Sequence, residues 1–262
     1  MNFSHLIHPL YSLSGFVVGL LVGLTGVGGG SLMTPLLMLV FGIRATAAVG
    51  TDLLYACVTK SVGTAVHGFN GTVDWRVVGW LATGSVPATA LTLFALSHYQ
   101  NGLDRSSNIL TSVLGVALIF TAISVIFRKQ ILNAFAKLTD RLTPRSTVLL
   151  TILSGAILGT LVSLSSVGAG AIGVTFLLIL YPKLPAGKIV GSDIAHSVPL
   201  TLVAGIGHWF LGSIDGILLV SLLIGSIPGI VVGSYIASRV PDKVLRPILA
   251  GTLAAVGARL SF

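Results

Sequence analysis

Two short glycine-rich stretches interrupt long apolar segments of the chain, and their residue types suit the binding of an anion. The first, Thr25 to Gly30, lies inside the apolar segment 12–41, and the second, Ser165 to Gly170, lies inside the segment 147–181. A glycine run lets the backbone turn sharply and leaves unpaired N–H groups at the start of the next helix. Together with the positive end of the helix dipole, these N–H groups can hold an anion without a cationic side chain. The candidate binding residues are Thr25, Gly28, Gly29, Gly30 and Ser31 at the first break and Ser165, Ser166, Gly168, Ala169 and Gly170 at the second.

Close packing of helices through small residues is the alternative interpretation of the glycines. It accounts well for the four-residue spacing of Gly15, Gly19 and Gly23, and for that of Gly155 and Gly159. Packing alone does not require consecutive glycines, so substrate contact is favoured at the two breaks. Neither break is a P-loop, because no Gly-Lys-Ser/Thr ending follows.

A few ionisable residues fall within apolar segments, where a charge is costly and therefore a functional hypothesis by default. Lys60 lies in the middle of its segment; it could hold the anion directly or pair with a buried acid such as Asp52. Asp52, Asp193 and His196 are candidates for proton coupling. The aspartates could instead be N-caps of helices that begin at them, and His196 could make only an interhelical hydrogen bond.

Four further polar residues are expected to be structural. Asp74 and Asp215 stand in short loops and most simply cap the helices that follow. His67 and His208 lie close to segment ends, where histidine usually has a structural role rather than one in gating.

The composition identifies the class of protein that must position these residues. Of 262 residues, 54% are hydrophobic and 8% are charged, whereas a soluble domain carries about 25% charged residues. The chain is therefore an all-α polytopic membrane protein. The net charge of +8 lies mainly in short loops, which is typical of topology determinants and not of a nucleic-acid surface. Cys57 is the single cysteine, so intrachain disulfides and cysteine-based metal sites are excluded, and no cofactor is expected. Residues 1–10 lack the features of a signal peptide.

The two halves of the chain are related by an internal duplication. The offset is 140 residues, and it becomes 141 after one inserted residue near Pro182. Rare residue types recur in this register, which is hard to obtain by chance in a chain rich in Leu, Val and Gly. Matching pairs include Gly28 and Gly168, Asp52 and Asp193, His67 and His208, Asp74 and Asp215, and Pro87 and Pro228.

Each half contains one broken apolar segment followed by three segments near the roughly 20 residues needed to cross a bilayer. The organisation is a first repeat (1–127), a basic cytoplasmic linker (128–146) expected to be a long polar loop, and a second repeat (147–262). The expected spans are 46–69, 77–96 and 106–127 in the first repeat and 189–211, 217–237 and 244–260 in the second.

Loop charges predict that each broken segment enters the membrane and returns as a hairpin. With the linker in the cytoplasm, this arrangement places eleven Lys and Arg residues inside and three outside (Arg44, Arg105 and Arg259). A hairpin plus three spans gives an odd number of crossings, so the repeats are expected to be inverted. Arms of about 11–14 residues reach about half the hydrocarbon thickness at 1.5 Å per residue. The two glycine-rich tips should therefore meet near the midplane.

The first break lies in the pattern Gly19-x-x-x-Gly23-Leu24-x-Gly26-x-Gly28-Gly29-Gly30, followed by Pro35-Leu36-Leu37. This pattern, with its weaker second copy, resembles the sulfite exporter TauE/SafE family. The resemblance implies membrane transport, mostly export, of small sulfur-containing or organic anions such as sulfite and sulfonates. In the second copy Ser163, Ser166 and Ala169 replace three of the glycines, so the two tips are chemically unequal.

We therefore expect a secondary transporter of a small anion in the inner membrane, with the bilayer as its other partner and a homo-oligomer left open. An anion or small-solute channel is the nearest alternative. An intramembrane enzyme is disfavoured because the chain has no Glu, no His/Glu metal cluster and no Gly-x-Ser-x-Gly motif. A membrane scaffold would leave Lys60 unexplained.

Overall fold

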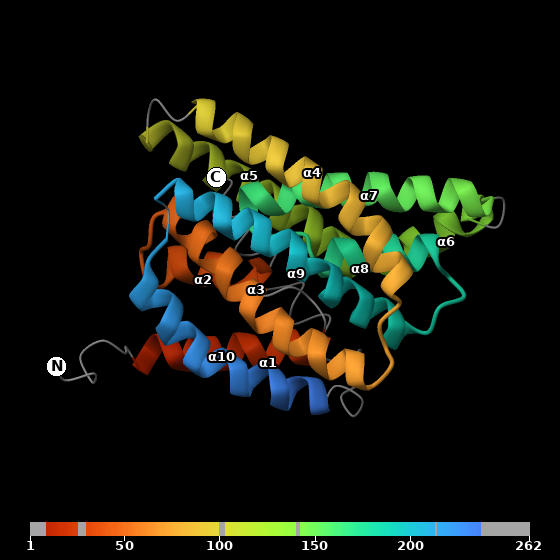
Figure 1. The fold of residues 1–262 in the computed structure, drawn as a ribbon, viewed down its shortest axis with the longest axis horizontal. Helices are drawn as coiled ribbons and strands as arrows, with labels where there is room; N and C mark the ends of the chain where they lie inside the picture. Colours follow the sequence, from red (N-terminus) through yellow and green to blue (C-terminus); the bar gives the residue numbers. More distant parts are fainter. Residues whose placement is uncertain (1–8, 26–29, 100–102, 140–141, 213, 237–262) are drawn as a thin grey trace.

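The protein is built entirely from helices in the part of the chain that the structure describes (Figure 1). The structure is a computed structural model and describes residues 9–25, 30–99, 103–139, 142–212 and 214–236. The helices are α1 (Pro9–Thr25), α2 (Gly30–Leu39), α3 (Ala45–Phe69), α4 (Trp75–Tyr99), α5 (Leu103–Ile126), α6 (Arg128–Thr139), α7 (Pro144–Ser165), α8 (Ala171–Leu180), α9 (Ala186–Phe210) and α10 (Gly216–Ile236).

The broken segment of each repeat packs against a helix of the other repeat. Helix α1 lies beside α10, and α7 lies beside α4 (Figure 1). A Cβ atom on Gly15 would stand 2.1 Å from the Leu222 carbonyl oxygen, and one on Gly155 would stand 2.2 Å from the Leu81 carbonyl oxygen. Both distances are far below van der Waals contact, so only glycine allows the backbones to approach this closely. The small-residue packing expected for these glycines is confirmed.

The same reciprocity ties the central helices to the loops of the opposite repeat. Helices α3 and α9 pack against each other in the interior (Figure 1). The Ser192 hydroxyl in α9 accepts a hydrogen bond from the Asp74 backbone N–H at 2.8 Å, and the Thr51 hydroxyl in α3 accepts one from the Asp215 N–H at 3.1 Å. Since Thr51 and Ser192 occupy equivalent positions in the duplication, the two repeats exchange equivalent contacts.

The loop aspartates cap the helices that follow them, as the sequence predicts. Asp74 Oδ1 accepts from the Arg76 and Val77 N–H groups at 3.1 and 3.3 Å. Asp215 Oδ1 accepts from the Ile217 and Leu218 N–H groups, both at 3.0 Å. Each cap satisfies backbone donors that the first turn of α4 or α10 would otherwise leave unpaired.

Four described helices are long and apolar enough to cross a membrane: α4, α7, α9 and α10. Helix α5 joins them if it is counted together with α6, from which it is bent by 73°. Helix α3 is as long as α9, with 25 residues, and it carries two charged residues, Asp52 and Lys60, in its interior. The expected span 244–260 lies outside the described residues.

Two expectations about these elements are wrong. The hairpin arms before the breaks are longer than 11–14 residues, because α1 has 17 residues and α7 has 22. Neither helix contains a proline after its first residue, so each helix continues to the glycine run. The linker is also not a loop, since most of it forms α6. Ile131 and Phe135 there stand four residues apart on one helical face, a pattern that favours an amphipathic helix lying on other helices.

Candidate functional site

The second glycine-rich break forms a buried turn between α7 and α8. Helix α7 ends at Ser165, and Ser166 caps it in the left-handed conformation at φ 58°. Gly168 and Gly170 follow with φ of 118° and 130°, a region that side chains rarely adopt. The Gly173 and Val174 N–H groups donate back to the carbonyls of Gly168 (3.2 Å) and Gly170 (2.8 Å). Helix α8 therefore starts on the turn itself, with the N–H groups of its first residues directed into the break.

The first break is only partly described. Helix α1 ends at Thr25 and α2 begins at Gly30, while Gly28 and Gly29 lie outside the described residues. Ser31, in the first turn of α2, is buried, and its hydroxyl has no hydrogen-bond partner within the described part of the chain. A hydroxyl in this position, at the positive end of a helix, is suited to an anionic ligand.

Asp52 is fully buried and faces the hairpin helices of both repeats. Helix α3 begins at Ala45, so Asp52 lies in its second turn and the interpretation of this residue as an N-cap is wrong. The Thr34 hydroxyl of α2 donates to Asp52 Oδ2 at 2.5 Å. Ser166, at the second break, lies near the same carboxylate. Asp52 therefore stands where the first hairpin helix and the second break come together.

Asp193 is the equivalent residue of the second repeat and is also fully buried. It lies in the second turn of α9, which begins at Ala186, so the N-cap interpretation is wrong here too. Neither of its carboxylate oxygens has a hydrogen-bond donor among the described residues. The carboxylate rests on Gly173 of α8, where an added Cβ atom would stand 2.1 Å from Asp193 Oδ1. The glycine makes the room that this carboxylate occupies.

Lys60 extends from α3 of the first repeat to the break of the second. Its side chain is 2% exposed, and Nζ donates to the Ala169 carbonyl oxygen at 3.4 Å. The ammonium also lies within electrostatic range of Asp52 and Asp193. The structure thus brings together Lys60, the second break and two of the three proton-coupling candidates, Asp52 and Asp193.

His196 makes the interhelical hydrogen bond that was the alternative to proton coupling. Its Nε2 is 2.9 Å from the Ser85 hydroxyl of α4, and its Nδ1 is buried without a partner in the described residues. His208 is also buried, and its Nε2 donates to the Ser163 carbonyl at 2.8 Å near the end of α7. His67 pairs with the Thr72 hydroxyl at 2.9 Å. The last two contacts agree with a structural role.

Two residues that the sequence does not single out contribute to this cluster. Thr34 supplies the donor to Asp52, and Gly173 supplies the space for Asp193. The duplication pairs Thr34 with Val174 and Met33 with Gly173, so each contact exists in only one repeat. That asymmetry is visible in the sequence but becomes informative only once the helices are placed.

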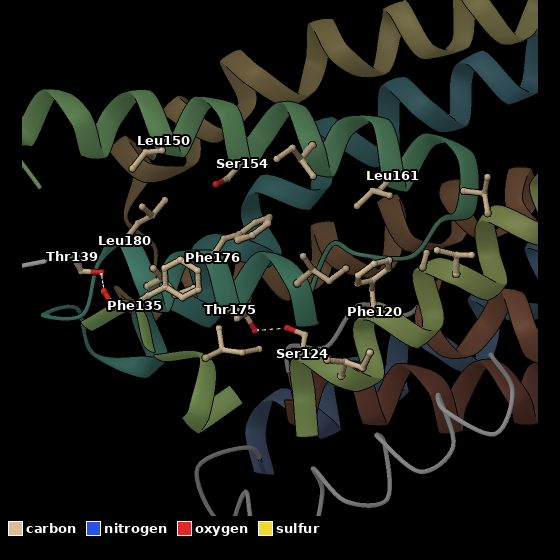
Figure 2. A pocket seen from close by; sticks show the side chains of 18 of the residues that line it. Phe120, Ser124, Phe135, Thr139, Leu150, Ser154, Leu161, Thr175, Phe176 and Leu180 are labelled. Atoms are coloured by element: carbon tan, nitrogen blue, oxygen red, sulfur yellow. Dashed lines mark hydrogen bonds between the residues drawn. The ribbon is translucent and has the colours of Figure 1, made fainter. Parts of the chain in front are cut away.

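A separate cavity of about 740 Å³ lies between α5, α6, α7 and α8 (Figure 2). Phe120, Phe135 and Phe176 line it together with aliphatic side chains, and none of its lining residues is charged. At its base the Ser124 hydroxyl donates to that of Thr175 at 2.9 Å (Figure 2). None of the candidate binding residues lines this cavity, and its walls are mainly apolar and carry no charge to attract an anion.

The described part of the chain therefore concentrates unpartnered polar atoms where the hairpins meet α3 and α9. Buried polar groups in proteins almost always have hydrogen-bond partners, so such atoms mark a place where a ligand or ion can bind. These atoms are Ser31 Oγ, Asp52 Oδ1, Ser166 Oγ, both carboxylate oxygens of Asp193 and His196 Nδ1.

Comparison with known proteins agrees with this architecture. The family model described as "Sulfite exporter TauE/SafE" matches residues 11–260. The chain is 39% identical over 249 residues to the probable membrane transporter protein YjnA of Bacillus subtilis, covering 95% of this chain and 97% of that one. It is 28% identical to the probable membrane transporter protein YdhB of Bacillus subtilis, covering 94% and 97% of the two chains. It is 27% identical to the probable membrane transporter protein MJ0441 of Methanocaldococcus jannaschii, covering 80% and 75%. No solved structure matches.

Proposed function

The chain belongs to the sulfite exporter TauE/SafE family and is a multi-pass membrane transporter, and we propose that it is a secondary transporter of a small sulfur-containing or organic anion. The single observation that carries the proposal is the contact of Lys60 with the second break beside two buried carboxylates. Charged groups at this depth are rare in membrane proteins and mark substrate or ion pathways. We propose that it lies in the inner membrane and that it exports its substrate.

The anion binds between the two breaks. The N-termini of α2 and α8 supply backbone donors, from Gly28, Gly29, Gly30 and Ser31 on one side and Gly168, Ala169 and Gly170 on the other. Thr25, Ser165 and Ser166 add hydroxyl groups, and Lys60 adds positive charge to the same region. If the repeats are inverted in the membrane, the breaks approach from opposite sides, and rocking of the surrounding helices opens the site alternately to each side.

The charges at the site couple anion binding to proton uptake. Asp52 and Asp193 together with Lys60 leave one net negative charge when all three are ionised, and this charge repels an anion. Protonation of one carboxylate removes the repulsion. Asp193 is the first candidate because its oxygens have no donor among the described residues, with Asp52 and His196 as the others. We therefore propose that the anion travels with a proton, and that a high cytoplasmic anion concentration drives export.

The test is thermal stabilisation of the purified protein by candidate anions: sulfite, sulfate, thiosulfate, sulfonates and carboxylates. A ligand that binds the folded state raises Tm by mass action, so at least one anion should stabilise the protein, and more strongly at acidic pH. The absence of a shift with every anion would contradict the proposal.

Two variants, one at each break, locate the binding site. Leucine at Ala169, which is 4% exposed, or at Gly29 should remove the anion-dependent shift. The control is Leu202→Ala on the exposed face of α9, which should keep the anion-dependent shift. Retention of the anion response in both folded tip variants would exclude the breaks as the site. Saturable flux with counterflow in proteoliposomes then separates a transporter from a channel.

A further inference from the structure

The surroundings of the Lys60 ammonium are those of a monovalent cation. Nζ faces the Ala169 carbonyl at 3.4 Å, in a non-helical turn between two residues of positive φ, Gly168 and Gly170. The carboxylates of Asp52 and Asp193 interact electrostatically with the same group. In transporters with broken helices, unwound carbonyls and helix C-terminal ends coordinate coupling cations. Here the C-terminal end of α7, at Ser165, supplies the negative end of a helix dipole.

Only the first repeat has the buried lysine, Lys60, whereas both repeats have the buried aspartate, Asp52 or Asp193. The residue equivalent to Lys60 in the second repeat is Thr201, whose hydroxyl donates within its own helix to the Ser197 carbonyl at 2.8 Å. A single ammonium therefore serves Asp52 of its own repeat and Asp193 of the other. Among the described residues, Arg128 on α6 also acts electrostatically on Asp193.

We propose that Lys60 is a tethered cation that permanently fills a monovalent cation site formed by Asp193, Asp52 and the Ala169 carbonyl. In this role Lys60 acts on the substrate through the site's charge and is a positioning residue. The wild-type transporter consequently needs no sodium ion. The inference rests on the proposed function in one respect, since it concerns the same site.

Removal of the ammonium should open this site to a free cation. In Lys60→Ala the lost group corresponds to a propylammonium ion, so n-propylammonium and Na⁺ are the probes. Tm is measured in NaCl, KCl and n-propylammonium chloride against choline chloride, whose cation is too bulky for the site. We expect Na⁺ or n-propylammonium to raise Tm of Lys60→Ala by at least about 3 °C and to leave the wild type unchanged.

Two controls make the result specific. Thr201→Ala, at the equivalent position, should show no cation response. Lys60→Ala/Asp193→Asn removes one carboxylate with the ammonium, so it should be more stable than Lys60→Ala in choline and should lose the cation response. If Lys60→Ala cannot be purified in any salt, the double variant decides: it should be obtained folded, and its failure to fold would overturn the proposal.

A Lys60→Ala protein that is indifferent to both cations, or a wild type that Na⁺ stabilises equally, would also overturn it. Anion titrations on the same samples keep the two proposals apart. If no anion stabilises the wild type while a cation still stabilises Lys60→Ala, only the proposed function is contradicted. An anion response in the wild type that disappears in Lys60→Ala and returns with neither cation shows direct anion binding by Lys60 and contradicts only the tethered cation.

Discussion

Lys60 of the first repeat donates a hydrogen bond to the Ala169 carbonyl in the break of the second repeat, with 3.4 Å between Nζ and the oxygen. This contact joins two segments that are 109 positions apart in the chain. It places the buried ammonium at the non-helical backbone between α7 and α8. Any movement of the second hairpin relative to α3 must therefore change the surroundings of this ammonium.

The space for Asp193 depends on Gly173. A methyl group at position 173 would stand 2.1 Å from Asp193 Oδ1, so Gly173→Ala should displace the carboxylate, cost about 1–3 kcal/mol of stability and reduce proton-coupled transport. Gly187→Ala, at the start of α9 with nothing within 4 Å of the added atom, is the matched control. Transport and Tm of both variants provide the check, and equal behaviour of the two would refute the role assigned to Gly173.

The hydroxyl of Thr34 holds the Asp52 carboxylate. Thr34→Val removes this donor at nearly constant volume and should destabilise the protein by about 1–3 kcal/mol, because a buried carboxylate oxygen loses its partner. The second repeat has Val174 at the equivalent position, which shows that valine fits a hairpin helix of this kind. Chemical unfolding measures the free energy of unfolding of Thr34→Val against that of the wild type. An unchanged value would show that the hydrogen bond contributes nothing to stability.

The glycines that bring α1 onto α10 and α7 onto α4 are expected to be equivalent in energy. Alanine at Gly15 or Gly155 forces a methyl group to 2.1 or 2.2 Å from a backbone oxygen, and backbone cannot swing away as a side chain can. Each substitution should lower stability by more than about 2 kcal/mol. Gly68→Ala, which meets nothing within 4 Å, should not. A large effect at only one of the two equivalent glycines would argue against reciprocal packing.

Inverted repeats place equivalent loops on opposite sides of the membrane. In a Cys57→Ser background, cysteine at Asn70 should react only with a membrane-impermeant thiol reagent applied from the cytoplasm. Cysteine at Leu211, the equivalent position, should react only from the outside. Both residues follow directly on a helix end, at α3 and α9. Labelling of both positions from the same side would rule out the inverted arrangement.

The sequence predicts the helices of this fold better than it predicts their contacts. Composition and duplication identify α3, α9 and the two breaks, because apolar length and repeated rare residues are local properties. The proximity of Lys60 to Ala169 is not local, since it arises from packing between repeats. The N-cap interpretation of Asp52 and Asp193 is wrong for a related reason: their helices begin seven residues earlier, at Ala45 and Ala186, so burial and not capping explains them.

The most direct test of coupled anion transport is accumulation in proteoliposomes driven only by a pH gradient. The solute is the anion that stabilises the purified protein most. With an acidic exterior, the wild type should concentrate this anion inside above its external level. Asp193→Asn should still exchange anion for anion but should lose the pH-driven accumulation. Accumulation that persists unchanged in Asp193→Asn, or a wild-type flux that shows neither saturation nor response to the pH gradient, would contradict the account.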